Sequence, residues 1–431
     1  MVSDMRSVMN SQIQWERLDN TANLFPVIAT AKMPNVYRLS VELWEEVEAT
    51  CLQKALSQIL PKFGYMNVCM RTGVFWYYFE TNSRKSPRVF LEQEFPCRFM
   101  EPKENRDYLF RVSYYHRRIS LEVFHVLADG MGGVNFLREL TYAYLRERHS
   151  ELAGLPSRLS SQTSLNSEDS YLSSYRKAQK KGYVQQRAYH MTGEKLGQGG
   201  FGVIHGYVSV AALKEICHAH GWSINEYMAG IYVYSIYRAC LHGSSSRVPI
   251  ELCVPVNLRP YFGSQTVRNF FVMISAGFKP QEQEYTREEV IRTIAEGLRS
   301  QMTKESLEKM FSYNVSNQKN IMLRAVPLTL KKPVIQAVYQ GSAKSTTTTM
   351  TNIGQIRIQE EYQPYIRHFH CMLSMSTGQN LKLSLCSYQD TLTMTFSSVL
   401  KSTSVQKQFF RELAADGLDV EIESNGVYHE M

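Results

Sequence analysis

The chain has 431 residues, of which 44% are hydrophobic and 20% are charged, the composition of a folded globular protein. This length exceeds what one compact core usually needs and predicts two domains. The net charge of +8 favours anionic partners. Because the sequence has no zinc-finger spacing, RNP motif or recognition helix, we do not expect nucleic acid to be among them.

We expect neither a transmembrane segment nor a secretory signal. No run approaches the roughly 18 uncharged apolar residues of a transmembrane segment, and the polar stretch 1–19 does not resemble a secretory signal. The eight cysteines are scattered without a Cys-x-x-Cys pair, so neither a metal site nor a disulfide framework is expected. These features predict a cytoplasmic protein with free thiols.

Residues 1–150 carry an alternation of strand-like and helix-like segments, which predicts a first α/β lobe. The connection His116-Arg117-Arg118 between two of the strands is typical of a hairpin. The predicted strands are 36–43, 69–79, 108–115 and 119–124, and the predicted helices are 47–60 and 134–145.

Residues 151–195 are rich in serine and then in basic residues, which predicts a mobile linker. The α/β pattern resumes over 196–431, and this segment is the predicted second lobe. Ser209, Ser223 and Thr286 are the expected N-caps of three helices, of which the first ends at Gly221. The strands predicted here are 249–256, 270–278, 369–375, 381–387 and 392–397.

Residues 196–204 (LGQGGFGVI) imitate the glycine-rich loop of a protein kinase. A kinase also needs an aspartate and an asparagine in its catalytic loop and an Asp-Phe-Gly that holds magnesium. The sequence contains neither His-Arg-Asp nor Asp-Phe-Gly. We therefore reject phosphoryl transfer and interpret the segment as a flexible turn that enters the second lobe.

The most informative segment is 121–133 (LEVFHVLADGMGG). An apolar strand ends at His125, Asp129 follows four residues later, and glycines lead into a helix. Neutral imidazole is a suitable proton acceptor near pH 7, for example from a hydroxyl or amine that attacks a thioester. The alternative is a structural histidine followed by an ordinary Asp-Gly turn.

The pattern His-x-x-x-Asp-Gly after a strand resembles that of the chloramphenicol acetyltransferase superfamily, which includes alcohol acetyltransferases, wax ester synthases and condensation domains. Three further segments are similar to elements of these enzymes: 70–75 to Leu-Arg-Thr-x-Phe, 254–260 to Pro-x-Asn-x-Arg, and 351–354 to Ser-Asn-x-Gly. The resemblance implies an α/β fold of mixed sheet and helices in two layers, with two lobes and an active-site channel between them.

The resemblance also implies roles for individual residues. His125 is the general base, and Gly130 permits the backbone conformation after Asp129. Asp129 pairs with an arginine, for which Arg71 is the first choice and Arg259 the second. Hydroxyls near 345–351 are candidates to stabilise the oxyanion; the turn and oxyanion candidates are Thr349, Thr351 and Asn352.

Two departures bear on the branch of the superfamily. Phe124 stands where condensation domains usually have a first histidine, and the Asp-Phe-Gly-Trp-Gly loop of plant acyltransferases is absent. Both favour an alcohol-acetyltransferase-like or wax-synthase-like enzyme. Such an enzyme uses acyl-CoA as co-substrate, has no tightly bound cofactor or metal, and acylates a small-molecule alcohol or amine.

Two alternatives stay open from the sequence. In one, an acidic acyl-carrier protein presents the acyl donor, as for a condensation domain, and the positive net charge of this chain suits such a partner. In the other, the chain is a binding module that has kept the fold without turnover.

Overall fold

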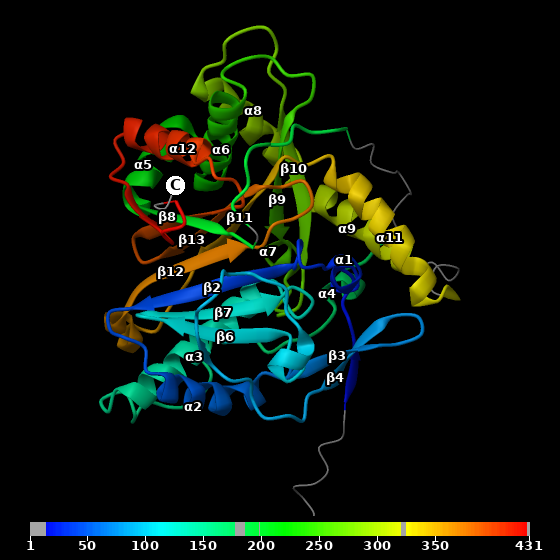
Figure 1. Cartoon of the computed structure of the whole chain (residues 1–431), viewed down its shortest axis with the longest axis vertical. Helices are drawn as coiled ribbons and strands as arrows, with labels where there is room; N and C mark the ends of the chain where they lie inside the picture. Colours follow the sequence, from blue (N-terminus) through cyan, green and yellow to red (C-terminus); the bar gives the residue numbers. More distant parts are fainter. Residues whose placement is uncertain (1–13, 177–185, 198, 320–324, 429–431) are drawn as a thin grey trace, which may run out of the picture.

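The computed structural model describes residues 14–176, 186–197, 199–319 and 325–428. These form an α/β protein with a five-stranded, a seven-stranded and a three-stranded sheet. The five-stranded and seven-stranded sheets lie in separate lobes, one above the other in Figure 1. The predicted fold class is therefore confirmed.

The five-stranded sheet has the order β12-β2-β7-β6-β5. Helices α2 and α3 cover one face of it, and its core contains large apolar side chains (Figure 1). Its elements are β2 (Val36–Leu43), β5 (Phe90–Leu91), β6 (Phe110–Tyr115), β7 (Arg118–Phe124), β12 (Ile366–Leu373), α2 (Ala49–Ile59) and α3 (Gly130–Arg148).

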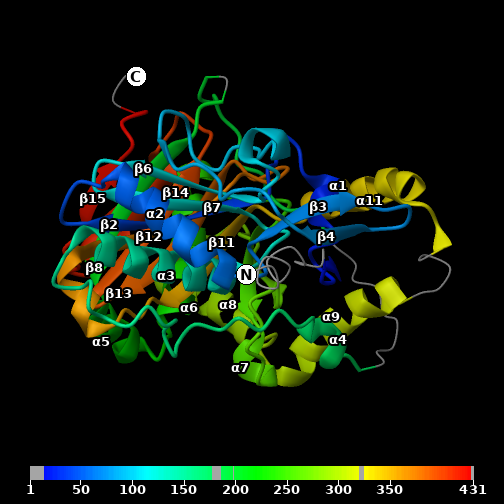
Figure 2. The same cartoon turned by 90° about the horizontal axis from the view of Figure 1, so that it is seen from below.

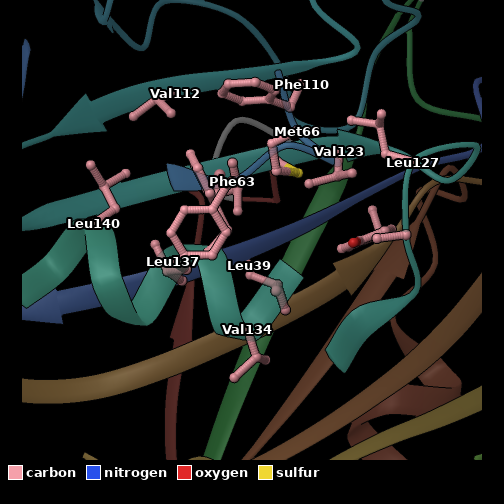
Figure 3. Close-up of a cluster of buried hydrophobic side chains, with 14 of the residues drawn as sticks. Leu39, Phe63, Met66, Phe110, Val112, Val123, Leu127, Val134, Leu137 and Leu140 are labelled. Carbon is pink, nitrogen blue, oxygen red and sulfur yellow. The ribbon is translucent and has the colours of Figure 1, made fainter. Parts of the chain in front are cut away.

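Figure 3 shows how this first core fills the space between the sheet and α3. Leu39 and Val123 extend from neighbouring strands, and Leu137 and Leu140 meet them from the helix. All four side chains are buried. Burying leucine-sized side chains contributes about 1.5–3 kcal/mol each, so this packing fixes the end of β7 and the start of α3.

The seven-stranded sheet has the order β10-β9-β11-β13-β14-β8-β15, and α6, α8 and α12 pack on its outer face (Figure 1). Its strands are β8 (Gly202–Ser209), β9 (Ile250–Asn257), β10 (Phe271–Phe278), β11 (Thr348–Gln355), β13 (Leu381–Tyr388), β14 (Thr391–Ser398) and β15 (Glu421–Ser424). The helices around it are α5 (Val210–His220), α6 (Ile224–Cys240), α7 (Arg259–Phe262), α8 (Arg287–Arg299) and α12 (Ser404–Ala415).

The remaining elements lie to one side of the lobes, where α1 packs against α11 (Figure 2). The three-stranded sheet has the order β1-β4-β3. The elements of this group are β1 (Trp15–Arg17), α1 (Phe25–Ile28), β3 (Val68–Thr72), β4 (Tyr77–Thr81), α4 (Ser170–Ser173), α9 (Lys304–Lys319) and α11 (Leu328–Ala343).

Strand β12 links the two lobes. Although it belongs to the second half of the chain, it pairs antiparallel with β2, with Cys371 opposite Leu39. It also packs against β13 and β14 of the seven-stranded sheet. The division into 1–150, 151–195 and 196–431 stays a prediction. The structure adds that one strand of the predicted second lobe belongs to the sheet of the first.

The described part of the predicted linker makes defined contacts. Leu152 and Tyr171 are buried, and the Tyr171 hydroxyl donates to the Phe271 carbonyl at 2.6 Å. The backbone N–H of Val267 donates to the Asn166 carbonyl at 2.7 Å. Residues 177–185, including most of the predicted basic run, lie outside the described residues.

Several expected elements differ from those observed. The strand predicted over 69–79 is a hairpin of β3 and β4, because the chain reverses between Gly73 and Trp76. The kinase-like segment ends in β8 rather than staying a turn. Residues 351–354, predicted as a turn, belong to β11, which carries an irregularity after Asn352.

Candidate active site

His125 lies just after β7, where residues from both halves of the chain meet. Its backbone N–H donates to the Asn35 carbonyl at 2.9 Å. The half-buried imidazole stacks on Phe25 at 4.7 Å between ring centroids, and Tyr37 and Phe271 lie 5.1 and 5.6 Å away. These aromatic neighbours restrict the orientation of the ring.

Asn269 determines which imidazole nitrogen carries the proton. Its amide nitrogen lies 3.0 Å from both the His125 carbonyl and a carboxylate oxygen of Asp19, and both partners are acceptors. The amide oxygen must therefore be the atom that lies 2.9 Å from His125 Nδ1. Neutral His125 then carries its proton on Nδ1, and the lone pair of Nε2 is left to accept a proton.

Asp19 supports Asn269 from the opposite side. It is 1% exposed and accepts from the Ala22 and Asn269 backbone N–H groups at 2.7 and 3.3 Å. Burial raises the pKa of Asp19 to about 7, although its hydrogen bonds and Arg268 oppose this shift. The result is a chain of hydrogen bonds from Asp19 through Asn269 to His125.

The electrostatic surroundings keep His125 neutral. Burial, with a smaller contribution from the positive charge of Lys382, lowers the pKa of His125 from its ordinary value. The charge of Asp129, the hydrogen bond to Asn269 and the backbone carbonyl of His125 act in the opposite direction. A histidine with a lowered pKa is in its proton-accepting form at neutral pH.

Asp129 holds the loop rather than facing a substrate. Its carboxylate accepts from both terminal nitrogens of Arg259 at 2.8 and 2.9 Å. It also accepts from the backbone N–H groups of Phe270, Met131 and Gly132 at 3.1, 3.2 and 3.4 Å. The last two contacts make Asp129 the N-cap of α3. Both charged side chains are about nine-tenths buried.

The first choice of partner for Asp129 is wrong in the structure. Arg71 lies on β3 and pairs with Glu80 at 2.7 Å and with Asp107 at 3.7 Å. Arg259 starts α7 immediately after β9, and this position directs its guanidinium at the loop. The second choice is the observed partner.

Gly130 also differs from its predicted role. It is the first residue of α3, and its φ is not positive, so its backbone conformation is open to other residues. A Cβ at this position would lie 2.4 Å from Ile353 Cδ1, so glycine lets the end of the Ile353 side chain pack directly against the start of α3. The same contact places the end of β11 against the His125–Asp129 loop.

The three predicted turn and oxyanion residues lie together on β11 but have different surroundings. The Thr349 hydroxyl donates to the Gln379 side chain at 2.8 Å, and the exposed Asn352 accepts from the Gly354 N–H at 2.8 Å. Thr351 is 8% exposed, and none of the side-chain hydrogen bonds among the described residues involves its hydroxyl. Of the two threonine hydroxyls, that of Thr351 is therefore the one without a side-chain hydrogen bond to another described residue.

Sequence reasoning missed Asp19, Asn269 and Lys382. Asn269 is 144 positions from His125, and no local pattern links them. The signal that was available is the run Arg268-Asn269 directly before a predicted strand, since polar residues at strand ends often build sites. Lys382 is a single cation inside a predicted apolar strand.

The fold defines the class to which the chain is similar: chloramphenicol-acetyltransferase-like acyltransferases and condensation domains. Similar solved structures are polyketide synthase associated protein 5 from Mycobacterium tuberculosis (TM-score 0.60, 14% identity, covering 93% of this chain and 96% of that one) and the condensation domain of the Monacolin K polyketide synthase MokA (TM-score 0.59, 10% identity, 94% and 97%).

A third is TRI101 of F. sporotrichioides complexed with coenzyme A and T-2 (TM-score 0.58, 10% identity, 95% and 99%). No family model matches the sequence, and no curated protein matches it. At these identities the likeness establishes the fold, and the chemistry must be argued from the residues.

Within residues 14–176, 186–197, 199–319 and 325–428, none of the helices has the length and hydrophobicity that a membrane span requires. No group of three or more histidine, cysteine or acidic side chains within the described ranges is arranged to hold a metal ion.

Proposed function

We propose that this protein transfers an acyl group from acyl-CoA to the hydroxyl or amine of a small molecule, with His125 as general base. The observation that supports this most directly is the fixed imidazole. Asn269 holds the proton on Nδ1, and the lowered pKa keeps Nε2 unprotonated. The coenzyme A in TRI101, which has the same fold, supports a CoA thioester as donor.

The proposed step needs no covalent acyl-enzyme. Nε2 of His125 takes the proton of the acceptor hydroxyl or amine as its oxygen or nitrogen attacks the thioester carbon. The tetrahedral oxyanion collapses, the carbon–sulfur bond breaks, and the imidazolium returns the proton to the leaving thiolate. Holding both substrates in line accounts for much of the rate gain.

The hydroxyl of Thr351 is the proposed donor to the oxyanion. It follows Met350, which is fully buried in the second core, so alternation along β11 turns Thr351 to the opposite face. Ile353, two residues on, touches Gly130 of the histidine loop. Loss of one fixed oxyanion donor typically lowers turnover by about 10²–10³.

The test is a panel of acyl-CoAs incubated with candidate alcohols and amines, with free thiol as the readout. His125→Ala should lower turnover by about 10²–10⁴ while the thermal unfolding midpoint changes little. His218→Ala, which alters an exposed histidine of α5, is the matched control. Near-normal turnover in His125→Ala on a verified substrate would contradict the mechanism.

A carrier-bound donor is the second candidate, favoured by the likeness to the condensation domain of MokA and by the net charge of +8. The same acyl groups presented on CoA and on an acyl-carrier protein separate the two. A kcat/KM at least tenfold higher with the carrier-bound donor would favour this alternative.

A further inference from the structure

The inner face of the seven-stranded sheet carries a buried lysine. Leu381, Leu383 and Leu385 of β13 point into the second core. Alternation therefore turns Lys382 to the opposite face, which it shares with Cys386, a member of the first core. Lys382 thus points towards the junction between the lobes.

The contacts of Lys382 leave it without a negative partner. Its Nζ donates to the Ser374 carbonyl at 2.7 Å and to the Ser376 hydroxyl at 2.6 Å. An ammonium group has three donors, so one hydrogen remains. None of the ion pairs between described residues includes Lys382, and no carboxylate is among the groups that shift its pKa.

Such an arrangement is costly for folding alone. Lys382 is 5% exposed, and burial lowers its pKa to about 8. Because this value still lies above 7, the ammonium form predominates at neutral pH. Buried cations are normally paired, because an uncompensated charge in the interior is strongly unfavourable. A partner that arrives with the substrate accounts for the charge.

The lysine is also close to the catalytic loop. The Ser374 N–H donates to the Val36 carbonyl at 3.0 Å, and the Val36 N–H donates to the Ser374 hydroxyl at 3.2 Å. The preceding residue, Asn35, accepts the backbone N–H of His125. The positive charge of Lys382 contributes to the lowered pKa of His125, so the two groups share one electrostatic environment.

We propose that Lys382 binds a carboxylate carried by one of the two substrates, so that the site selects an acyl group or an acceptor with a carboxylate near the reacting carbon. This inference rests on the proposed function and names its substrate class. The carboxylate would take the third hydrogen of Nζ. Polar groups in the same row, such as Thr349 on the neighbouring strand, would border it.

The experiment compares matched probes by isothermal titration calorimetry. Glutaryl-CoA and valeryl-CoA test the acyl group, and 4-hydroxybutyrate and butan-1-ol test the acceptor. In one of these pairs, the charged probe should bind about ten- to hundredfold more tightly than the neutral probe, which is the usual contribution of a hydrogen bond to a charged group. The arm that shows the preference identifies which substrate carries the carboxylate.

Three variants assign the preference to the lysine. Lys382→Gln keeps a hydrogen-bond donor for the serines but removes the charge, and it should abolish the preference. Lys382→Met should do the same and raise the thermal unfolding midpoint, because a buried charge is lost. Lys407→Met, which removes an exposed lysine of α12, should retain the wild-type preference.

The outcomes separate this inference from the proposed function. Equal affinity for charged and neutral probes in both pairs, or a preference that persists in Lys382→Gln, overturns the inference. If Lys382→Met instead lowers the thermal unfolding midpoint and leaves the preference for the charged probe unchanged, Lys382 only stabilises the connection 374–380, and the inference is also overturned. Release of free thiol is measured separately. Turnover without a preference for the charged probe would support the acyltransferase function alone, whereas a preference without turnover would support the carboxylate site alone.

Discussion

Replacing Arg259 by methionine should destabilise the protein strongly, because the change strands the carboxylate of Asp129. The two guanidinium bonds to Asp129 are lost, and the carbonyls of Thr266 and Arg268, which accept from Arg259 at 2.6 and 2.7 Å, lose their donors. Breaking a buried ion pair by removing one partner costs about 3–5 kcal/mol. Three backbone N–H groups still contact Asp129, which favours the lower end of this range.

The assay is urea unfolding at pH 7 of Arg259→Met, Asp129→Asn and the double variant. Because the residues share one interaction, the double variant should lose at least about 1 kcal/mol less than the sum of the single losses. Arg247→Met, at an exposed position, is the control and should change stability by less than about 0.5 kcal/mol. Additive losses, or a single loss below about 1 kcal/mol, would refute the role assigned to this pair.

Three further predictions concern the histidines. Asn269→Leu should lower kcat by about tenfold or more without raising KM comparably, because the ring of His125 loses the acceptor that fixes its tautomer; an unchanged kcat would contradict this. In the wild type, the midpoint of the acidic decline of kcat/KM should lie below pH 6.5, because the pKa of His125 is lowered and Nε2 stays unprotonated as the pH falls. A midpoint above pH 6.5 would argue against His125 as the base. Burial lowers the pKa of His205 to about 3, so below pH 6.5 this histidine binds a proton in the unfolded chain but not in the folded one. The free energy of unfolding should therefore fall by about 1.4 kcal/mol per pH unit from this residue as the pH drops towards 3. His205→Gln should flatten this acid dependence in urea unfolding, and a slope equal to that of the wild type would count against the prediction.

The parts of the structure that followed from the sequence are those set by neighbouring residues. Ser209, Ser223 and Thr286 each cap the helix predicted to follow them, and Gly221 ends the first with a positive φ of 68°. Such caps satisfy backbone groups within a few residues, so the sequence alone identifies them. The strand before His125 and the helix after it follow from the same kind of local pattern.

The partners of the site residues were decided by tertiary packing. Arg71 and Arg259 are equivalent as residue types, and only the path of the chain after β9 brings Arg259 to Asp129. The link from His125 to Asn269 has the same origin. The helix at 328–343 was missed because Pro333 interrupts its pattern, although the structure accommodates proline there.

The position of β12, a strand of the second half of the chain at the edge of the five-stranded sheet, has a consequence for biosynthesis. During synthesis on the ribosome, β2, β6 and β7 emerge early, but their edge stays uncovered until β12 (Ile366–Leu373) has been made. At about 5–20 residues per second, the 242 positions from Phe124 to Ile366 represent a delay of about 12–48 s. Until then the open edge of β2 can pair with other chains, so we expect the nascent first lobe to need chaperones, and truncation before β12 should yield aggregated protein.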